Sequence, residues 1–65
     1  ARERVDAAIE ALERAIELDA TDSEAHYWLG RAHLDKGSMI GALRQCEQLE
    51  AIDSTLAARL RAHVY

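Results

Sequence analysis

The second half of this chain repeats the first. Laying residues 5–21 on residues 39–55, a shift of 34 positions, pairs Ala8 with Ala42 and matches apolar residues along the overlap. The other matched pairs are Val5 with Met39, Ile9 with Leu43, Leu12 with Cys46, Glu13 with Glu47, Leu18 with Ile52, Asp19 with Asp53 and Thr21 with Thr55. A period of this length is typical of folds in which one small unit stacks on the next and buries its apolar face against that neighbour. The repeat therefore restricts the chain to a stack of short elements.

Composition indicates that these elements are helices. Alanine supplies 13 of the 65 residues, 31% of residues are charged, and there is no proline. Alanine and mixed charges favour helix, whereas a β-sandwich needs runs of β-branched and aromatic residues that this chain lacks. The core must be thin, because Leu, Ile and Val together supply only 14 residues and Phe none. We predict an all-α fold of four helices in antiparallel hairpins, forming one domain over residues 1–65.

Apolar spacing and cap residues set the helix boundaries. Thr21 and Glu24, three positions apart, fit a capping box at the start of the second helix. Gly37 suits the left-handed position after that helix, and Ser38 suits the N-cap of the third. Trp28 is expected on the apolar stripe of the second helix. The third stripe is predicted to comprise Met39, Ala42, Leu43, Cys46, Leu49 and Ile52. The four predicted helices span residues 2–19, 23–36, 38–53 and 55–65.

This helix-turn-helix repeat resembles the tetratricopeptide repeat (TPR) family. The residues that carry the resemblance are Leu29-Gly30, Ala42 and the closing pairs Leu18-Asp19 and Ile52-Asp53. The resemblance covers the whole chain. The chain would begin with the second helix of one repeat, continue with one full repeat, and end with the first helix of the next repeat. His26 and His33 stand where the family usually has aromatic residues, and no proline closes either repeat. The resemblance therefore implies a right-handed helical solenoid that is less regular than usual.

Gly30 and Ala42 are small enough to let the two helices of the full repeat approach closely. Replacing Gly30 with Leu is therefore predicted to open that hairpin. Stacked repeats usually need three or more units, and this chain holds about two. Four outcomes are left open: a piece of a longer array, an end-to-end oligomer, a domain swap, or a marginally stable monomer.

The net charge and the cysteine content restrict the classes of partner and the cellular compartment that we expect. A net charge of −4 and an isoelectric point near 5.2 argue against nucleic acid, which requires a clustered basic face. No run of about 18 apolar residues exists, so we expect no membrane span. One cysteine cannot form an internal disulfide, which favours a reducing compartment such as the cytoplasm.

The histidines and the cysteine do not form a recognisable reactive site. His26 and His33 are separated by about 10.5 Å along a helix, too far to share a metal ion. Cys46 lies on an apolar stripe beside Glu47 and Glu50, whereas a reactive thiol needs an exposed electropositive site. We therefore predict no enzyme activity, no cofactor and no metal.

The resemblance implies a non-catalytic scaffold that binds a peptide or a partner helix on a concave face lined by the first helix of each repeat. Arg31 and Arg61 would then hold an acidic partner by forked hydrogen bonds. The predicted groove residues are Glu24, Tyr27, Arg31, Leu34, Asp35 and Arg61, accompanied by Ala58 and Tyr65. The alternatives are that these residues face solvent or a neighbouring repeat, and that the chain self-assembles into homo-oligomers through its acidic first and basic last helices.

Overall fold

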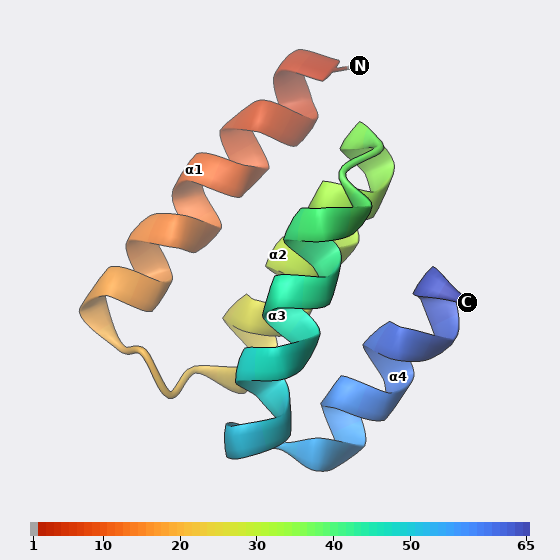
Figure 1. Cartoon of the computed structure of the whole chain (residues 1–65). Helices are drawn as coiled ribbons and strands as arrows, with labels where there is room; N and C mark the ends of the chain where they lie inside the picture. Colours follow the sequence, from red (N-terminus) through yellow and green to blue (C-terminus); the bar gives the residue numbers. More distant parts are fainter. Residues whose placement is uncertain (1) are drawn as a thin grey trace.

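The computed structural model describes residues 2–65, which form four α-helices and no strand (Figure 1). The helices are α1 (Arg2–Leu18), α2 (Ser23–Lys36), α3 (Met39–Ile52) and α4 (Ser54–Val64). Every helix end lies within one residue of its predicted position. The predicted all-α class with helical hairpins is confirmed. None of the helices in residues 2–65 has the length and apolar character needed to cross a membrane.

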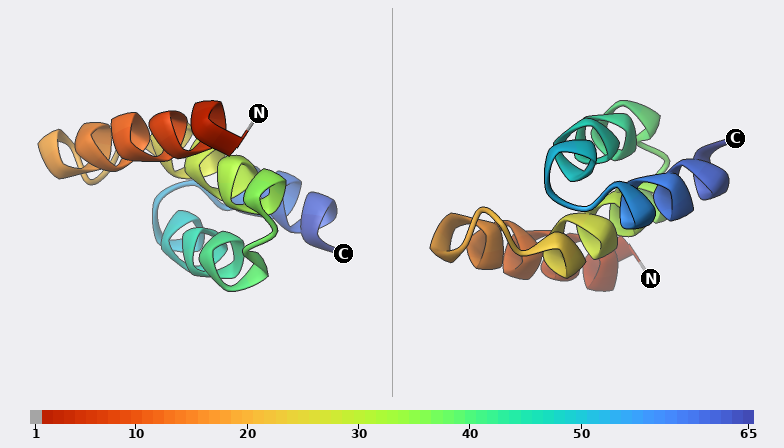
Figure 2. Two further views of the ribbon diagram at one scale, coloured as in Figure 1. Left: turned by 90° about the horizontal axis from the view of Figure 1, so that it is seen from above. Right: turned by 90° about the horizontal axis from the view of Figure 1, so that it is seen from below.

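α2 is the central element of the stack. It packs against α1 on one side, α3 on another and α4 on a third, and α3 also packs against α4. Consecutive helices run in opposite directions, and α1 and α4 lie at opposite ends of the arrangement (Figures 1 and 2). This order is the one expected when short connections fold each helix back on the previous one.

Two small apolar clusters hold the helices together. The first lies between α1 and α2 and contains Ile9, Leu29 and Ala32, with Val5, Leu12 and Ile16 packed against it. The second joins α3 and α4 around Cys46, Leu49, Ala57 and Leu60, with Tyr27, Leu34, Leu56 and Val64 packed against it. Because both clusters touch α2, loss of that helix would expose residues of each cluster.

The turn between α2 and α3 forms as the sequence predicts. Gly37 has φ of 87°, and its N–H donates to the carbonyls of His33 and Leu34, so the helix ends in the left-handed conformation that glycine tolerates. Ser38 then caps α3, its hydroxyl oxygen accepting from the N–H of Gly41 at 3.3 Å. Local side-chain chemistry thus explains both helix ends.

The capping box predicted for α2 is wrong. Asp22 is the N-cap, and its carboxylate accepts from the N–H of Ala25 at 3.2 Å. Thr21 instead bonds backward, with its N–H and hydroxyl both donating to Asp19 at 3.0 and 2.7 Å. These bonds lower the pKa of the Asp19 carboxyl. Since Thr21 is committed to this Asx-type turn, the helix starts one position later than a capping box would allow.

Gly30 makes its close approach to α4, not to Ala42 of α3 as predicted. A Cβ at position 30 would collide with the side chain of Leu60. The close contact of the α2–α3 hairpin lies elsewhere, where a Cβ at Gly41 would come within 2.7 Å of the His33 ring. The Leu60 side chain of α4 occupies the space that a side chain at position 30 would need, so the small residue serves the α2–α4 contact.

Three residues predicted on apolar stripes are exposed. Trp28, Met39 and Ile52 keep 51%, 53% and 37% of their surface accessible. α2 contacts three helices with the rest of its circumference, so Trp28 falls on the one remaining side. Met39 and Ile52 are the first and last residues of α3, beyond the reach of its neighbours.

Candidate functional site

A polar and aromatic cluster lies where α2 and α4 meet. We call it the α2–α4 face and define it by Tyr27, Trp28, Arg31 and His63. The Arg31 guanidinium donates to the Tyr27 hydroxyl oxygen at 3.3 Å and lies 3.3 Å from Nε2 of His63. The Tyr27 hydroxyl is in turn 3.4 Å from the same His63 nitrogen. Because Tyr27 and Arg31 are four residues apart on one helix, both can reach the single histidine of α4.

Trp28 extends this cluster outward. Its ring meets that of Tyr27 edge to face, with centroids 5.1 Å apart and an angle of 81° between the planes. The Arg31 guanidinium carbon lies 5.9 Å from the centroid of the Trp28 ring. This is the outer limit of a cation–π contact. The face therefore combines a fixed cation with an exposed aromatic surface, a pairing that is enriched at protein interfaces.

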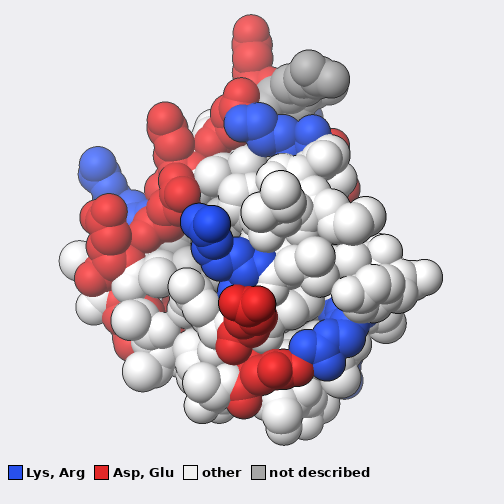
Figure 3. Space-filling view, in the orientation of Figure 1, with Lys and Arg blue, Asp and Glu red and all other residues white. Residues whose placement is uncertain are grey.

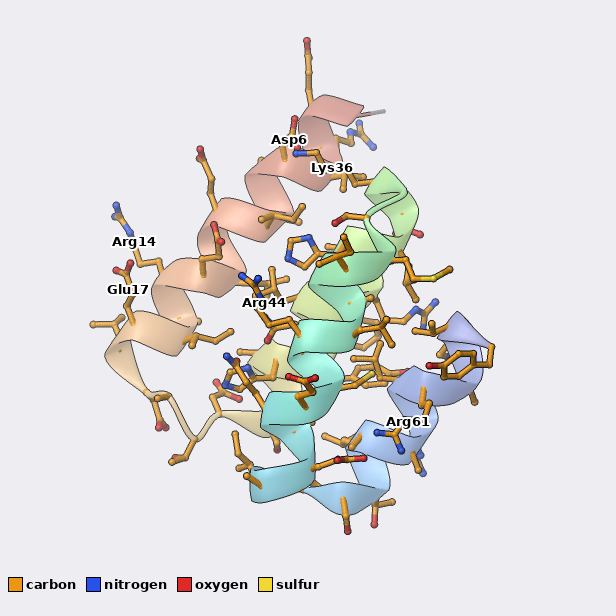
Figure 4. All side chains as sticks on the ribbon, in the orientation of Figure 1. Asp6, Arg14, Glu17, Lys36, Arg44 and Arg61 are labelled. Carbon is orange, nitrogen blue, oxygen red and sulfur yellow. The ribbon has the colours of Figure 1, made fainter. Side chains whose placement is uncertain are left out.

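Arg61 is not part of this cluster, although the sequence suggested a fork with Arg31. Its guanidinium, labelled in Figure 4, forms an ion pair with Glu50 of α3, and this pairing raises the pKa of Arg61. Residues 61 and 63 project about 200° apart around a helix. When His63 faces α2, Arg61 must therefore face away from it, toward α3. His63 takes the place beside Arg31 that was expected for Arg61.

The remaining groove residues fall into two groups. Glu24 and Asp35 are exposed on α2, along the same side as Trp28 and Arg31. Leu34 is half-buried and packs against the α3–α4 cluster, so it supports the face from beneath. The accompanying residues Ala58 and Tyr65 are exposed on α4.

His63 and Trp28 are the members of the cluster that sequence reasoning missed. The spacing of Leu56, Leu60 and Val64 marks a helix, but it does not say how that helix is rotated against α2. That rotation follows from the packing of Leu60 on Gly30 of α2 and on the Cys46 and Leu49 cluster of α3, and it brings His63 to Tyr27.

The other histidine and cysteine candidates are occupied by structural contacts. His26 is 3% exposed, with its two ring nitrogens 2.7 Å from the Gln45 side chain and 2.9 Å from the Ala20 carbonyl. Cys46 is 1% exposed, and burial raises the pKa of its thiol. Within residues 2–65, no three His, Cys, Asp or Glu side chains gather where they could hold a metal ion.

Three surface hollows lie away from the α2–α4 face. One lies on the outer side of α1 around Ala7 and Ala11, one at the turn between α2 and α3, and one beside Arg44 on α3. None is lined by Tyr27, Trp28 or His63. Enclosed pockets suit small molecules, whereas an open face of this kind suits a partner that lies across it.

Comparison with known families agrees with this arrangement. The sequence pattern of a family described as TPR repeat matches residues 1–37, more than half of the 65 residues. No curated protein and no solved structure matches the chain. TPR repeats generally mediate protein–protein interactions and are typically non-catalytic. On the strength of this match and of its antiparallel helical hairpins, the chain belongs to the tetratricopeptide repeat family.

Proposed function

We propose that the chain binds a protein partner through the α2–α4 face and that Arg31 receives an acidic side chain of that partner. The observation that carries this proposal is the fixing of Arg31 by Tyr27, His63 and Trp28. A guanidinium that is already oriented loses less conformational freedom when it binds a carboxylate. Its remaining N–H groups offer the forked geometry that carboxylates accept.

Arg31 takes part in neither ion pair of the described residues, so its charge can pair with a carboxylate of a partner. Among residues 3–65, the two ion pairs join Lys36 to Asp6, both labelled in Figure 4, and Arg61 to Glu50, and neither uses Arg31. The contacts of Arg31 are an aromatic ring, a hydroxyl and an imidazole. An incoming carboxylate would therefore not have to break an existing ion pair.

The stripe along α2 defines the partner further. Glu24, Trp28, Arg31 and Asp35 follow one another at spacings of four, three and four, so they share one side of the helix. A segment with an acid in its middle and basic residues on either side complements this order of charges. A uniformly acidic segment would be repelled at Glu24 and Asp35. The partner we propose is a short peptide or helix with a Lys/Arg–Asp/Glu–Lys/Arg pattern.

The single tryptophan allows peptide binding to be measured by fluorescence without labelling the chain. Trp28 is the only Trp in the sequence and lies on the proposed face, so its emission should change on binding. A peptide series that varies the central acid and the basic flanks would be titrated against the chain. We expect the central Glu→Gln peptide to bind at least tenfold more weakly, because one charge-assisted hydrogen bond contributes roughly 1.5–3 kcal/mol.

Three arginine variants separate the proposed site from its neighbours. Arg31→Ala is expected to weaken binding about as much as loss of the peptide acid. Arg61→Ala and Arg44→Ala are matched controls on α4 and α3 and should leave affinity within about twofold. Equal affinity for Arg31→Ala and the unaltered chain would refute the role of Arg31. A loss with Arg61→Ala as large as the loss with Arg31→Ala would contradict the assignment to Arg31 without Arg61 and would support the pair of arginines expected from the sequence.

A further inference from the structure

His63 places a titratable imidazole beside Arg31 on the α2–α4 face. Its Nε2 lies 3.3 Å from the Arg31 guanidinium and 3.4 Å from the Tyr27 hydroxyl. A guanidinium carries only donors, so Nε2 can bond to Arg31 only when it has a free lone pair. A protonated imidazole has an N–H at both ring nitrogens and no lone pair left to accept with. The hydrogen bond between Arg31 and His63 therefore belongs to the neutral form of the histidine.

A carboxylate bound at Arg31 would favour the protonated form instead. An imidazolium N–H at the same place would donate to the carboxylate that Arg31 holds, and its positive charge would pair with the acid. Arg31 would lose its contact with His63 but would stay oriented by Tyr27 and Trp28. We propose that His63 takes up a proton from solvent when the α2–α4 face binds a carboxylate. This inference rests on the proposed function, in which Arg31 receives the acid of the partner.

Within residues 3–65, the groups bonded to the His63 ring are the Tyr27 phenol and the Arg31 guanidinium, both on α2. One turn beyond Arg31 on the same helix lies Asp35, and one turn before His63 on α4 lies Arg59. Both of these side chains are exposed, so water and salt weaken their effect on the imidazole. A carboxylate of the partner would therefore be the first acid to bond to His63 directly.

The other helix packed against α4 is α3, and its ionisable groups are engaged elsewhere. Glu50 pairs with Arg61, which projects to the opposite side of α4 from His63. The Cys46 thiol is buried in the α3–α4 cluster. In the view of Figure 3, acidic side chains gather along the α1 edge of the molecule, across from α4. The negative charge that would pair with a protonated His63 is therefore expected from a partner.

Protonation of His63 and binding of a carboxylate would then favour each other. Linkage requires that a ligand which favours the protonated form binds more tightly as the pH falls. Imidazoles change charge between about pH 5 and 8, so the increase in affinity belongs to this range. Because His63 is exposed, we expect affinity to increase about three- to fivefold between about pH 7.5 and 5.5. Below about pH 5, a glutamate of the peptide gains a proton itself, and affinity should fall again.

Peptide titrations at a series of pH values measure this linkage. One peptide carries a central glutamate between lysines, and a second carries cysteic acid at the centre, whose sulfonate stays ionised throughout. Both are expected to show the increase of about three- to fivefold, followed by the emission of Trp28. Calorimetry in two buffers that differ in ionisation enthalpy counts the protons exchanged on binding. At about pH 6.5 it should record the uptake of a fraction of one proton for each bound peptide.

His63→Gln separates proton uptake from the other contacts of the face, because its amide can accept from Arg31 but cannot gain a proton. Its affinity for the cysteic acid peptide is expected to be the same at about pH 7.5 and 5.5, without proton uptake. His33→Gln is the matched control, since His33 also lies on α2 but packs its ring on Gly41 of α3. That variant should keep the full increase. Circular dichroism at each pH verifies that the helices remain intact.

Three results would each overturn the proposal: an unaltered chain whose affinity stays level or falls between about pH 7.5 and 5.5, binding without proton uptake, or an increase that persists in His63→Gln. Binding that needs Arg31 but does not respond to pH would refute proton uptake alone. Equal binding by Arg31→Ala and the unaltered chain would refute the proposed function. Absence of peptide binding at every pH would refute both.

Discussion

At the scale of single residues, Gly30 and Leu60 are the pair on which the α2–α4 contact depends. A Cβ at position 30 would overlap the Leu60 side chain, which is fully buried. Gly30→Ala should therefore destabilise the chain by about 1–3 kcal/mol, and Gly30→Leu by more, with separation of α4 from α2. Urea unfolding followed by circular dichroism measures this free energy.

A double variant distinguishes this steric cost from a general effect of glycine. Leu60→Ala creates room, so Gly30→Ala should cost clearly less in that background. Gly37→Ala is a useful comparison, because no atom lies near that position and its cost of about 1 kcal/mol comes from positive φ alone. If Gly30→Ala cost the same with and without Leu60, the contact would not be the cause.

The Cys46 thiol makes the free energy of unfolding depend on pH in the alkaline range. Burial raises the thiol pKa in the folded state above its ordinary value of 9.0, so the folded chain holds this proton more tightly than the unfolded chain does. The stabilisation is complete below pH 9.0 and is lost as pH rises through the folded-state pKa. Urea unfolding across this range should show a steeper loss for the unaltered chain than for Cys46→Ala. Equal slopes would show that the thiol does not contribute.

At the scale of helices, Asp53 serves two elements at once. Its N–H donates to the Leu49 carbonyl at the end of α3, and its carboxylate accepts from the N–H groups of Thr55 and Leu56 at the start of α4. Asp53→Ala should lower the unfolding free energy by about 1 kcal/mol, whereas Asp53→Asn should retain most of the cap. Thr21→Ala, which removes a turn contact but no helix cap, should cost less. Thermal unfolding ranks the three variants, and a reversed order for Asp53→Ala and Thr21→Ala would contradict these cap assignments.

At the scale of the whole molecule, stability should decrease from the centre of the stack to its ends. α2 packs against all three other helices, whereas α1 has its helix contact with α2 alone. In a stack held by neighbour contacts, such an end helix opens without unfolding the rest. Amide hydrogen exchange should therefore show α1 exchanging faster than α2 and α3. Uniform exchange in all four helices would indicate a single cooperative unit instead.

The sequence by itself determined the helices and most of their ends. Helical spacing of apolar residues, the left-handed turn at Gly37 and the cap at Ser38 are interactions among residues close along the chain, so they can be read without knowing what packs on them. The 34-residue shift also established the repeat and the hairpin class. Cys46 was correctly placed in the core, because its position on an apolar stripe is likewise local.

Only the tertiary structure decided how each helix is rotated and what it meets. That rotation turned Gly30 toward Leu60, brought His63 instead of Arg61 to Arg31, and left Trp28 on the open side of α2. Two helices in contact can turn about their own axes and still bury apolar residues, so periodicity alone does not choose among these arrangements. The physical reason is that α2 must satisfy three neighbours at once, a condition that no local stretch of sequence contains.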